Sequence, residues 1–62
     1  MRALPAKALH KGLDDIYVWR DFYVHGYDKE TDKFVGRWAT DGDNGREVKV
    51  PRLHLLFDVV IF

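Results

Sequence analysis

Two alternating apolar runs, separated by a short charged stretch, constrain this chain more than any other feature of its sequence. The first run, over 22–27, reads Phe-Tyr-Val-His-Gly-Tyr, and the second, over 34–39, reads Phe-Val-Gly-Arg-Trp-Ala. Side chains two positions apart share one face of a strand. The polar stretch 28–32 has the length of a hairpin loop. The pattern therefore predicts an antiparallel β-hairpin.

The register of this hairpin follows if Asp28 pairs with Asp32 across the loop. This pairing keeps the apolar residues of both strands on one side, as burial demands. It also sets each glycine opposite a larger side chain, which predicts that both glycines make room in a tightly curled sheet. The opposed pairs are Phe22 with Trp38, Val24 with Gly36, and Gly26 with Phe34.

The sequence after the hairpin predicts further strands. Asp-Gly and Asn-Gly dipeptides within 41–45 mark a turn. Residues 46–50 alternate, with Val48 and Val50 facing inward, and Pro51 ends the strand because it lacks a ladder donor. Residues 52–57 fit either a short helical turn or a closing strand. Leu53 faces the core in both cases.

The two ends of the chain carry weaker patterns. Residues 1–15 are predicted to form a flexible or short-helix arm, with Pro5 at the first helical position and Gly12 as the stop. The β-rich module is then 16–62, and 16–19 lead into its first strand. The apolar tail 59–62 is an aggregation hazard when exposed. It pairs as a strand, docks elsewhere, or marks a chain cut from something longer.

Composition excludes several classes of function. Sixty-two residues make one small domain. Ten basic and ten acidic residues cancel, which argues against a general nucleic-acid binder. No apolar run approaches the roughly 20 residues of a membrane span. Cys and Ser are absent, and hydroxyl nucleophiles are limited to Thr31 and Thr40, so no enzyme and a cytoplasmic location are expected.

No metal or cofactor is expected either. The acidic loop around Asp41 and Asn44 lacks the spacing of a calcium-binding loop, because Gly45 falls one position too early and no terminal Glu follows. The three histidines are far apart in sequence, without the close-spaced pair that zinc sites use. The loop is therefore interpreted as a plain turn.

The run of strand, hairpin, Asp-Gly turn, strand and closing turn over about 36 residues resembles Tudor, chromo-barrel and related SH3-like modules. It begins with Phe-x-Val-x-Gly-Tyr-Asp and ends with Val-x-Val-Pro-Arg-x-x-Leu-Leu. The resemblance implies a mainly β fold: a small SH3-like, Tudor-like antiparallel barrel of three to five strands. A fold of this kind does not fix a function.

Tudor-like and chromo-like modules hold methylated lysine or arginine between aromatic rings by cation–π attraction. The resemblance therefore implies a candidate aromatic cage for a methylated peptide, with an acidic residue at its rim. The available residues are Trp19, Tyr23, Tyr27, Trp38 and Asp41. The alternative is that these rings only supply core volume and cover the outer face of the hairpin.

A second resemblance concerns residues 50–57, Val-Pro-Arg-Leu-His-Leu-Leu-Phe, together with the Gly-Tyr-Asp of the hairpin. This run looks like a segment in the N-terminal tail of axonemal dynein heavy chains. That family continues with an Asp-Pro step into a helix, where this chain has Val-Val-Ile-Phe after Asp58. The ATPase phosphate-binding motif is absent, so the resemblance implies a piece of the non-motor tail.

Two hypotheses about function result. In the first, the chain is a non-catalytic structural and protein-interaction module that contacts neighbouring dynein tail segments or docking proteins, in the cytoplasm and at the axoneme of a cilium. In the second, it reads methylated peptides through the aromatic cage. Convergence of the cage rings with Asp41 around an open notch is the geometry that would separate them.

Overall fold

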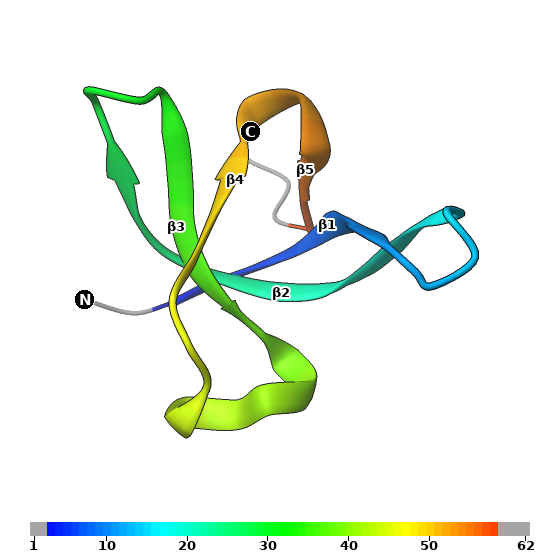
Figure 1. Cartoon of the computed structure of the whole chain (residues 1–62). Coiled ribbons are helices and arrows are strands. Elements are labelled where there is room, and N and C mark those ends of the chain that lie inside the picture. The colour runs from blue at the N-terminus through cyan, green and yellow to red at the C-terminus, as the bar shows by residue number, and fades with distance from the viewer. Residues whose placement is uncertain (1–2, 59–62) are drawn as a thin grey trace.

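The computed structural model describes residues 3–58 of the chain (Figure 1). Five antiparallel strands form one sheet, in the order β4-β3-β2-β1-β5. Two short 3-10 turns, η1 and η2, connect the later strands. The bounds are β1 Leu4–Lys11, β2 Tyr17–Asp28, β3 Lys33–Trp38, η1 Ala39–Asn44, β4 Val48–Pro51, η2 Arg52–His54 and β5 Leu55–Phe57.

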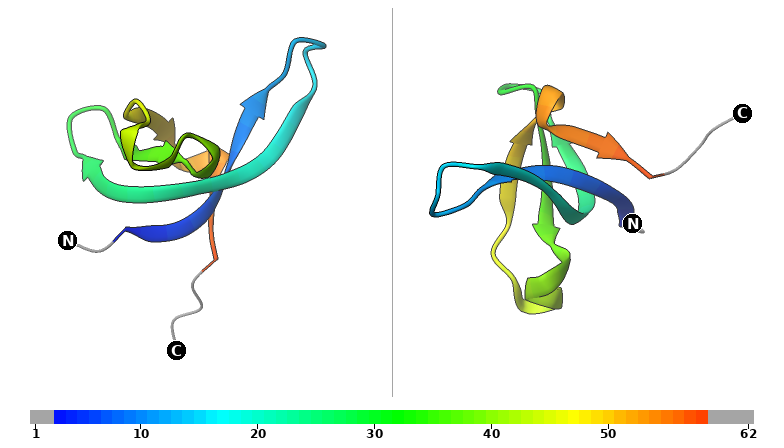
Figure 2. Two further views of the ribbon diagram at one scale, coloured as in Figure 1. Left: turned by 90° about the horizontal axis from the view of Figure 1, so that it is seen from below. Right: turned by 90° about the vertical axis from the view of Figure 1, so that its right-hand side faces the viewer.

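The topology is that of a small SH3-like barrel, as the sequence predicts. The η2 turn leads the chain from β4, at one end of the strand order, to β5, which pairs with β1 at the other end. The long strand β2 bends so that its two halves pair with different neighbours, β1 and β3, and its curvature is clear in both views of Figure 2. The β1–β2 hairpin projects beyond the rest of the sheet.

The predicted N-terminal arm is wrong, because most of it is β1, which lies between β2 and β5 in the sheet. This strand pairs with β2 over its whole length and with β5 over Ala6–Ala8. Ala6 and Ala8 are 1% and 0% exposed and lie in the core. Alanine and leucine have high helix propensity, but tertiary contacts readily override propensity, and one or two helical turns are marginal in isolation. Pairing on both sides outweighs that preference.

The predicted hairpin register is confirmed in its first half and wrong in its second. Phe22 pairs with Trp38 and Val24 with Gly36, as expected. A β-bulge then shifts the register between Val24 and Gly26. Gly26 consequently faces Val35 rather than Phe34. A bulge inserts one extra residue into one strand, and it moves the side chains that follow to the opposite face.

The core is small and lies on the inner, concave face of the sheet. Leu55 belongs to it, whereas Leu53 is 89% exposed, so the expected inward position of Leu53 is wrong. The reason is that η2 occupies residues 52–54, and strand alternation begins again only at Leu55. The buried residues are Ala6, Ala8, Phe22, Val24, Val50 and Leu55, with Phe34, Trp38 and Val48 packed against them.

The two glycines of the hairpin differ in the space around them. A Cβ atom at Gly36 would lie 2.6 Å from Cε2 of Phe22 and would collide with the backbone oxygen of Tyr23. A Cβ atom at Gly26 would meet nothing within 4 Å. The prediction that glycine makes room in the sheet therefore holds at Gly36 and is wrong at Gly26.

Candidate functional site

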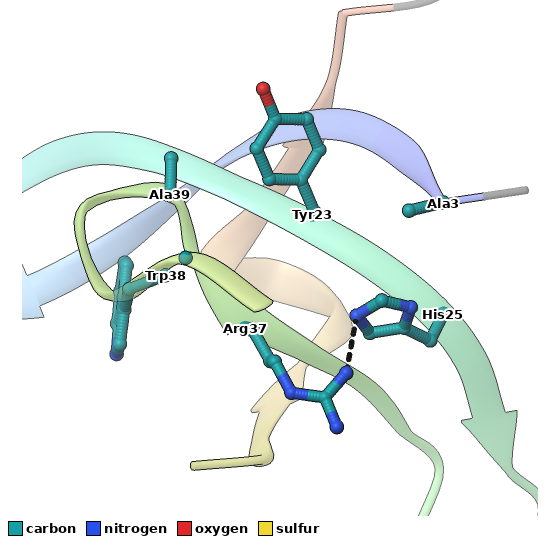
Figure 3. A pocket seen from close by; sticks show the side chains of 7 residues that line it. Ala3, Tyr23, His25, Arg37, Trp38 and Ala39 are labelled. Atoms are coloured by element: carbon teal, nitrogen blue, oxygen red, sulfur yellow. Dashed lines mark hydrogen bonds between the residues drawn. The ribbon is translucent and has the colours of Figure 1, made fainter. Parts of the chain in front are cut away.

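The residues predicted to form an aromatic cage lie in separate places. Tyr23 and Trp38 line one pocket of about 400 Å³, shown in Figure 3. Their rings point away from each other, because Trp38 turns inward and packs edge-on against Phe22 with ring centroids 5.0 Å apart. The pocket is lined by Ala3, Tyr23, His25, Arg37, Trp38, Ala39 and Gly42.

The charged group of this pocket, the Arg37 guanidinium, is already engaged. Its Nε donates to the backbone oxygen of Gly45 at 2.8 Å, and its Nη1 lies 2.9 Å from Nε2 of His25 (Figure 3). Nη2 lies 3.7 Å from a carboxylate oxygen of Glu47. The pocket therefore offers the faces of Tyr23 and His25 to a ligand rather than an uncommitted cation.

Tyr27 lies in a second, apolar groove of about 480 Å³. The bulge places it beside Phe34, with ring centroids 5.1 Å apart, and Phe34 in turn meets Phe57 edge-on at 5.4 Å. We call this pocket the apolar groove. It is lined by Leu4, Val24, His25, Gly26, Tyr27, Phe34 and Phe57.

Trp19 and Asp41 line neither of these pockets. Trp19 is exposed on the outer, convex face of the sheet, where it pairs with Leu9 of β1. Asp41 is exposed in η1. Of the five predicted cage residues, only Tyr23 and Trp38 therefore share a pocket, and their rings do not face each other.

The outer face of β1, β2 and β5 carries a set of half-exposed apolar side chains, of which only Trp19 and Tyr23 are among the predicted cage residues. Leu9 pairs with Trp19 near the projecting hairpin, and Pro5 pairs with Tyr23 two rows away. The Lys7–Asp21 ion pair, at 2.7 Å, lies between these two rows. We define the outer strip as Pro5, Leu9, Trp19, Tyr23 and Leu56, the last of which pairs with Lys7.

The apolar groove and the outer strip both depend on β1, and this explains why the sequence did not reveal them. Leu4 lines the groove, and Pro5 and Leu9 belong to the outer strip. If residues 1–15 are interpreted as an arm, they provide no strand with which Trp19 and Phe57 can pair. The sequence does contain a signal for this strand. Pro5, Lys7 and Leu9 alternate with Ala6 and Ala8, and this alternation has the period of a strand.

Ion pairs tie the β2–β3 turn beside the groove to β4 and η2. Lys49 lies 2.7 Å from Asp28, and Arg52 lies 2.8 Å from Asp32, which also accepts a hydrogen bond from the hydroxyl of Tyr27. The pKa of the Asp28 carboxyl is lowered to about 2, mainly by the hydrogen bond from Lys49 and next by one from Thr31. The pKa of Asp32 is also lowered, mainly by the hydrogen bond from Tyr27 and next by the one from Arg52.

Acid is expected to destabilise the barrel through Asp28. Its pKa is lower in the folded chain than the ordinary value of 3.8, so its stabilising effect is complete above that value and is lost as the pH falls through about 2. An Asp28→Asn variant should lose less thermal stability than the wild type between these two pH values. Thermal unfolding followed by circular dichroism across this range measures the difference. Equal losses in the two proteins would contradict the assignment.

Residues 3–58 contain no group of three or more His, Cys, Asp or Glu side chains placed to hold a metal ion. Over the same part of the chain, no helix is long and apolar enough to cross a membrane. Comparison with family models, curated proteins and solved structures gives no match to this chain.

Proposed function

We propose that this chain is a non-catalytic protein-interaction module whose binding surface is the outer strip. The observation that carries the proposal is the exposure of Trp19, Tyr23 and Leu56 on one face of the sheet. Exposed apolar patches with polar neighbours are typical of protein–protein contact sites. Aromatic residues are enriched at such interfaces and often dominate their binding energy.

The position of the Lys7–Asp21 ion pair supports this proposal. Both side chains are largely exposed, at 46% and 70%, so the pair contributes little to the stability of the free chain. At a contact site it supplies one charge of each sign between two apolar rows. A charge pair of this kind favours a partner with complementary charges and fixes its orientation.

A finer proposal is that the partner is a neighbouring segment of an axonemal dynein tail. It rests on the resemblance of residues 50–57, which form the end of β4, η2 and β5. Val50 and Leu55 from this run are buried, and their apolar character is explained by the core. Leu53 and Leu56 are exposed, and Leu56 belongs to the outer strip. Two of the three leucines in the resembling run are thus available to a partner.

Truncation of the central aromatic residue tests both proposals. The wild-type chain is titrated with recombinant axonemal dynein tail segments, and the Kd is measured by isothermal titration calorimetry. Trp19→Ala is expected to weaken binding by about thirtyfold, the effect of removing a residue worth about 2 kcal/mol at an interface. Circular dichroism should show that the variant remains folded, because the Trp19 side chain lies outside the core.

Leu13→Ala is the matched control, because Leu13 is fully exposed in the β1–β2 turn but lies outside the outer strip. It should leave the Kd unchanged. Equal weakening by both variants would argue against the outer strip as the binding surface. Failure of the wild type to bind any tail segment would argue against the dynein assignment.

The alternative, a reader of methylated peptides, has less geometric support. Its predicted rings are divided between the pocket of Figure 3, the apolar groove and the outer face, and Asp41 lines neither pocket. A cation held by aromatic rings requires several ring faces within about 6 Å of one point. The interaction module is therefore the function that we propose.

A further inference from the structure

The outer half of the β1–β2 hairpin is a two-stranded ribbon with an open edge. On its side away from β1, β2 pairs with β3 only from Phe22 onward. Among residues 3–58, no strand therefore lies beside 17–20 on that side, and this part of the hairpin projects from the molecule (Figure 2). A two-stranded ribbon by itself is only marginally stable in water. Its open edge is a template for a further strand.

The hydrogen bond at the hairpin turn shows which backbone groups face this edge. The amide of Gly12 donates to the backbone oxygen of Ile16 at 3.0 Å. Hydrogen-bonded and non-hydrogen-bonded rows alternate in an antiparallel pair, so the row of Val18 is hydrogen-bonded to β1 as well. The N–H and C=O groups of Tyr17 and Trp19, in the rows on either side of Val18, therefore point away from β1 and toward the open edge.

The side chains along the same edge are apolar on both faces of the ribbon. Tyr17 and Trp19, 53% and 43% exposed, lie on the outer face, and Val18, 47% exposed, lies on the inner face. A strand that covers them must carry apolar side chains on both of its faces. The segment 16–19, Ile-Tyr-Val-Trp, is itself a strand of that kind.

We propose that two copies of this chain form a symmetric dimer in which the open edges of β2 pair as antiparallel strands, with the two-fold axis at Val18. A symmetric contact brings the same patch of both copies together, so the patch must be complementary to itself. This register sets Val18 opposite Val18, and Tyr17 of each copy opposite Trp19 of the other. The backbone groups of Tyr17 and Trp19 then form the hydrogen-bonded rows, and each ring gains an aromatic neighbour across the strands.

The ends of this register fit the rest of each copy. Arg20 falls opposite Ile16 of the second copy, so the shared ladder ends before Phe22, where β3 occupies the same edge. The next row brings Asp21 toward Asp15 of the second copy. Each of these carboxylates already has a lysine partner in its own chain, at 2.7 Å for Asp21 and 3.2 Å for Asp15. Their negative charges are therefore compensated where the copies meet.

The dimer goes beyond the proposed function, because it uses an edge of the sheet rather than the outer face. Pro5, Tyr23 and Leu56 of the outer strip lie outside the shared ladder. Val18 does not belong to the outer strip, so variants at this position test the dimer alone. Because that test involves no other protein, its result is independent of whether the outer strip binds a partner.

A charge at the two-fold axis tests the dimer. Sedimentation velocity of the full chain over a series of concentrations measures the dissociation constant of the dimer. Val18→Asp sets two carboxylates against each other and is expected to raise this constant by about a hundredfold. Leu13→Asp, the matched control, adds the same charge in the exposed turn outside the ladder and should leave the constant unchanged. A wild-type chain that stays monomeric, or equal effects of the two variants, would overturn the proposal.

Exchange of the charge at the axis tests the register. Val18→Lys should also dissociate, but an equimolar mixture of Val18→Lys and Val18→Asp should form a heterodimer, because opposite charges then meet. Circular dichroism should show that both variants remain folded, since the Val18 side chain lies outside the core. A mixture that stays monomeric would contradict the two-fold axis at Val18.

The wild-type chain gives a readout that does not depend on how the variants fold. Across the two-fold axis the Val18 row is non-hydrogen-bonded, so the two Cα atoms lie about 4.5 Å apart. A dimer assembled from isotope-labelled and unlabelled chains should therefore show a nuclear Overhauser contact between the Val18 α-protons of the two copies. Absence of this contact in a dimeric sample would show that the proposal is wrong.

Discussion

Gly36→Ala is expected to prevent the chain from folding. The added Cβ atom would lie 2.6 Å and 2.9 Å from ring atoms of Phe22 and would overlap the backbone oxygen of Tyr23. Backbone atoms of a central strand cannot move aside without breaking the ladder on which the barrel depends. Overpacking a core costs about 1–3 kcal/mol and more where the backbone must shift. A domain of this size has only about 3–9 kcal/mol in total.

Gly26→Ala is the matched control, because Gly26 lies on β2 in the same hairpin and has no atom within 4 Å of the added group. It should fold and unfold cooperatively, with stability equal to that of the wild type or higher by about 0.4–1 kcal/mol through the lower entropy of the unfolded chain. Urea unfolding monitored by circular dichroism compares the three proteins. A cooperative Gly36→Ala variant with wild-type stability would show that the packing around Phe22 is described incorrectly.

Phe22→Ala is expected to cost about 3–5 kcal/mol, the usual penalty for removing a buried aromatic ring. Phe22 is 1% exposed and is the largest fully buried side chain of the described residues. It pairs with Trp38, and its ring fills the space left by Gly36. Trp38 is only partly buried, so the central ring of the core is Phe22.

Tyr23→Ala gives the comparison for this variant. It removes an aromatic ring from the adjacent position of β2, but that ring is exposed on the outer face, so the expected cost is about 1 kcal/mol or less. Both variants can be measured by chemical unfolding of the full chain. Similar costs at positions 22 and 23 would mean that the inner and outer faces of β2 are wrongly assigned.

The hairpin was predictable because it is local and its signal is periodic. Phe22, Val24, Gly36 and Trp38 lie as the alternation indicates, and pairing of Phe22 with Trp38 follows from keeping both apolar sets on one side. The bulge at His25 was not predictable, since a single extra residue leaves the composition of the strand unchanged. It alone places Tyr27 beside Phe34, and so it separates Tyr27 from the ring of Tyr23.

The first strand was missed for a different reason. Residues 4–11 consist mainly of alanine, leucine and lysine, which favour a helix when considered alone. Their strand conformation is stabilised by partners far along the chain, namely β2 on one side and β5 on the other. The candidate site depended on the same partners, because Leu4 lines the groove and Leu9 pairs with Trp19. The sequence pattern singles out Trp19 and Tyr23, but not the strand β1 that pairs with both of them.

The pairing of β1 with β5 also determines the order in which the fold is completed during synthesis. Among the described strands β1 comes first in the chain, and its second edge is covered by the one that comes last, β5. The β2–β3 hairpin can form early from local contacts, but Ala6 and Ala8 acquire their final neighbours only when the final strand emerges. Contacts of such high sequence separation form slowly. Until β5 pairs with it, β1 has one open strand edge, and open edges of this kind favour pairing with other chains.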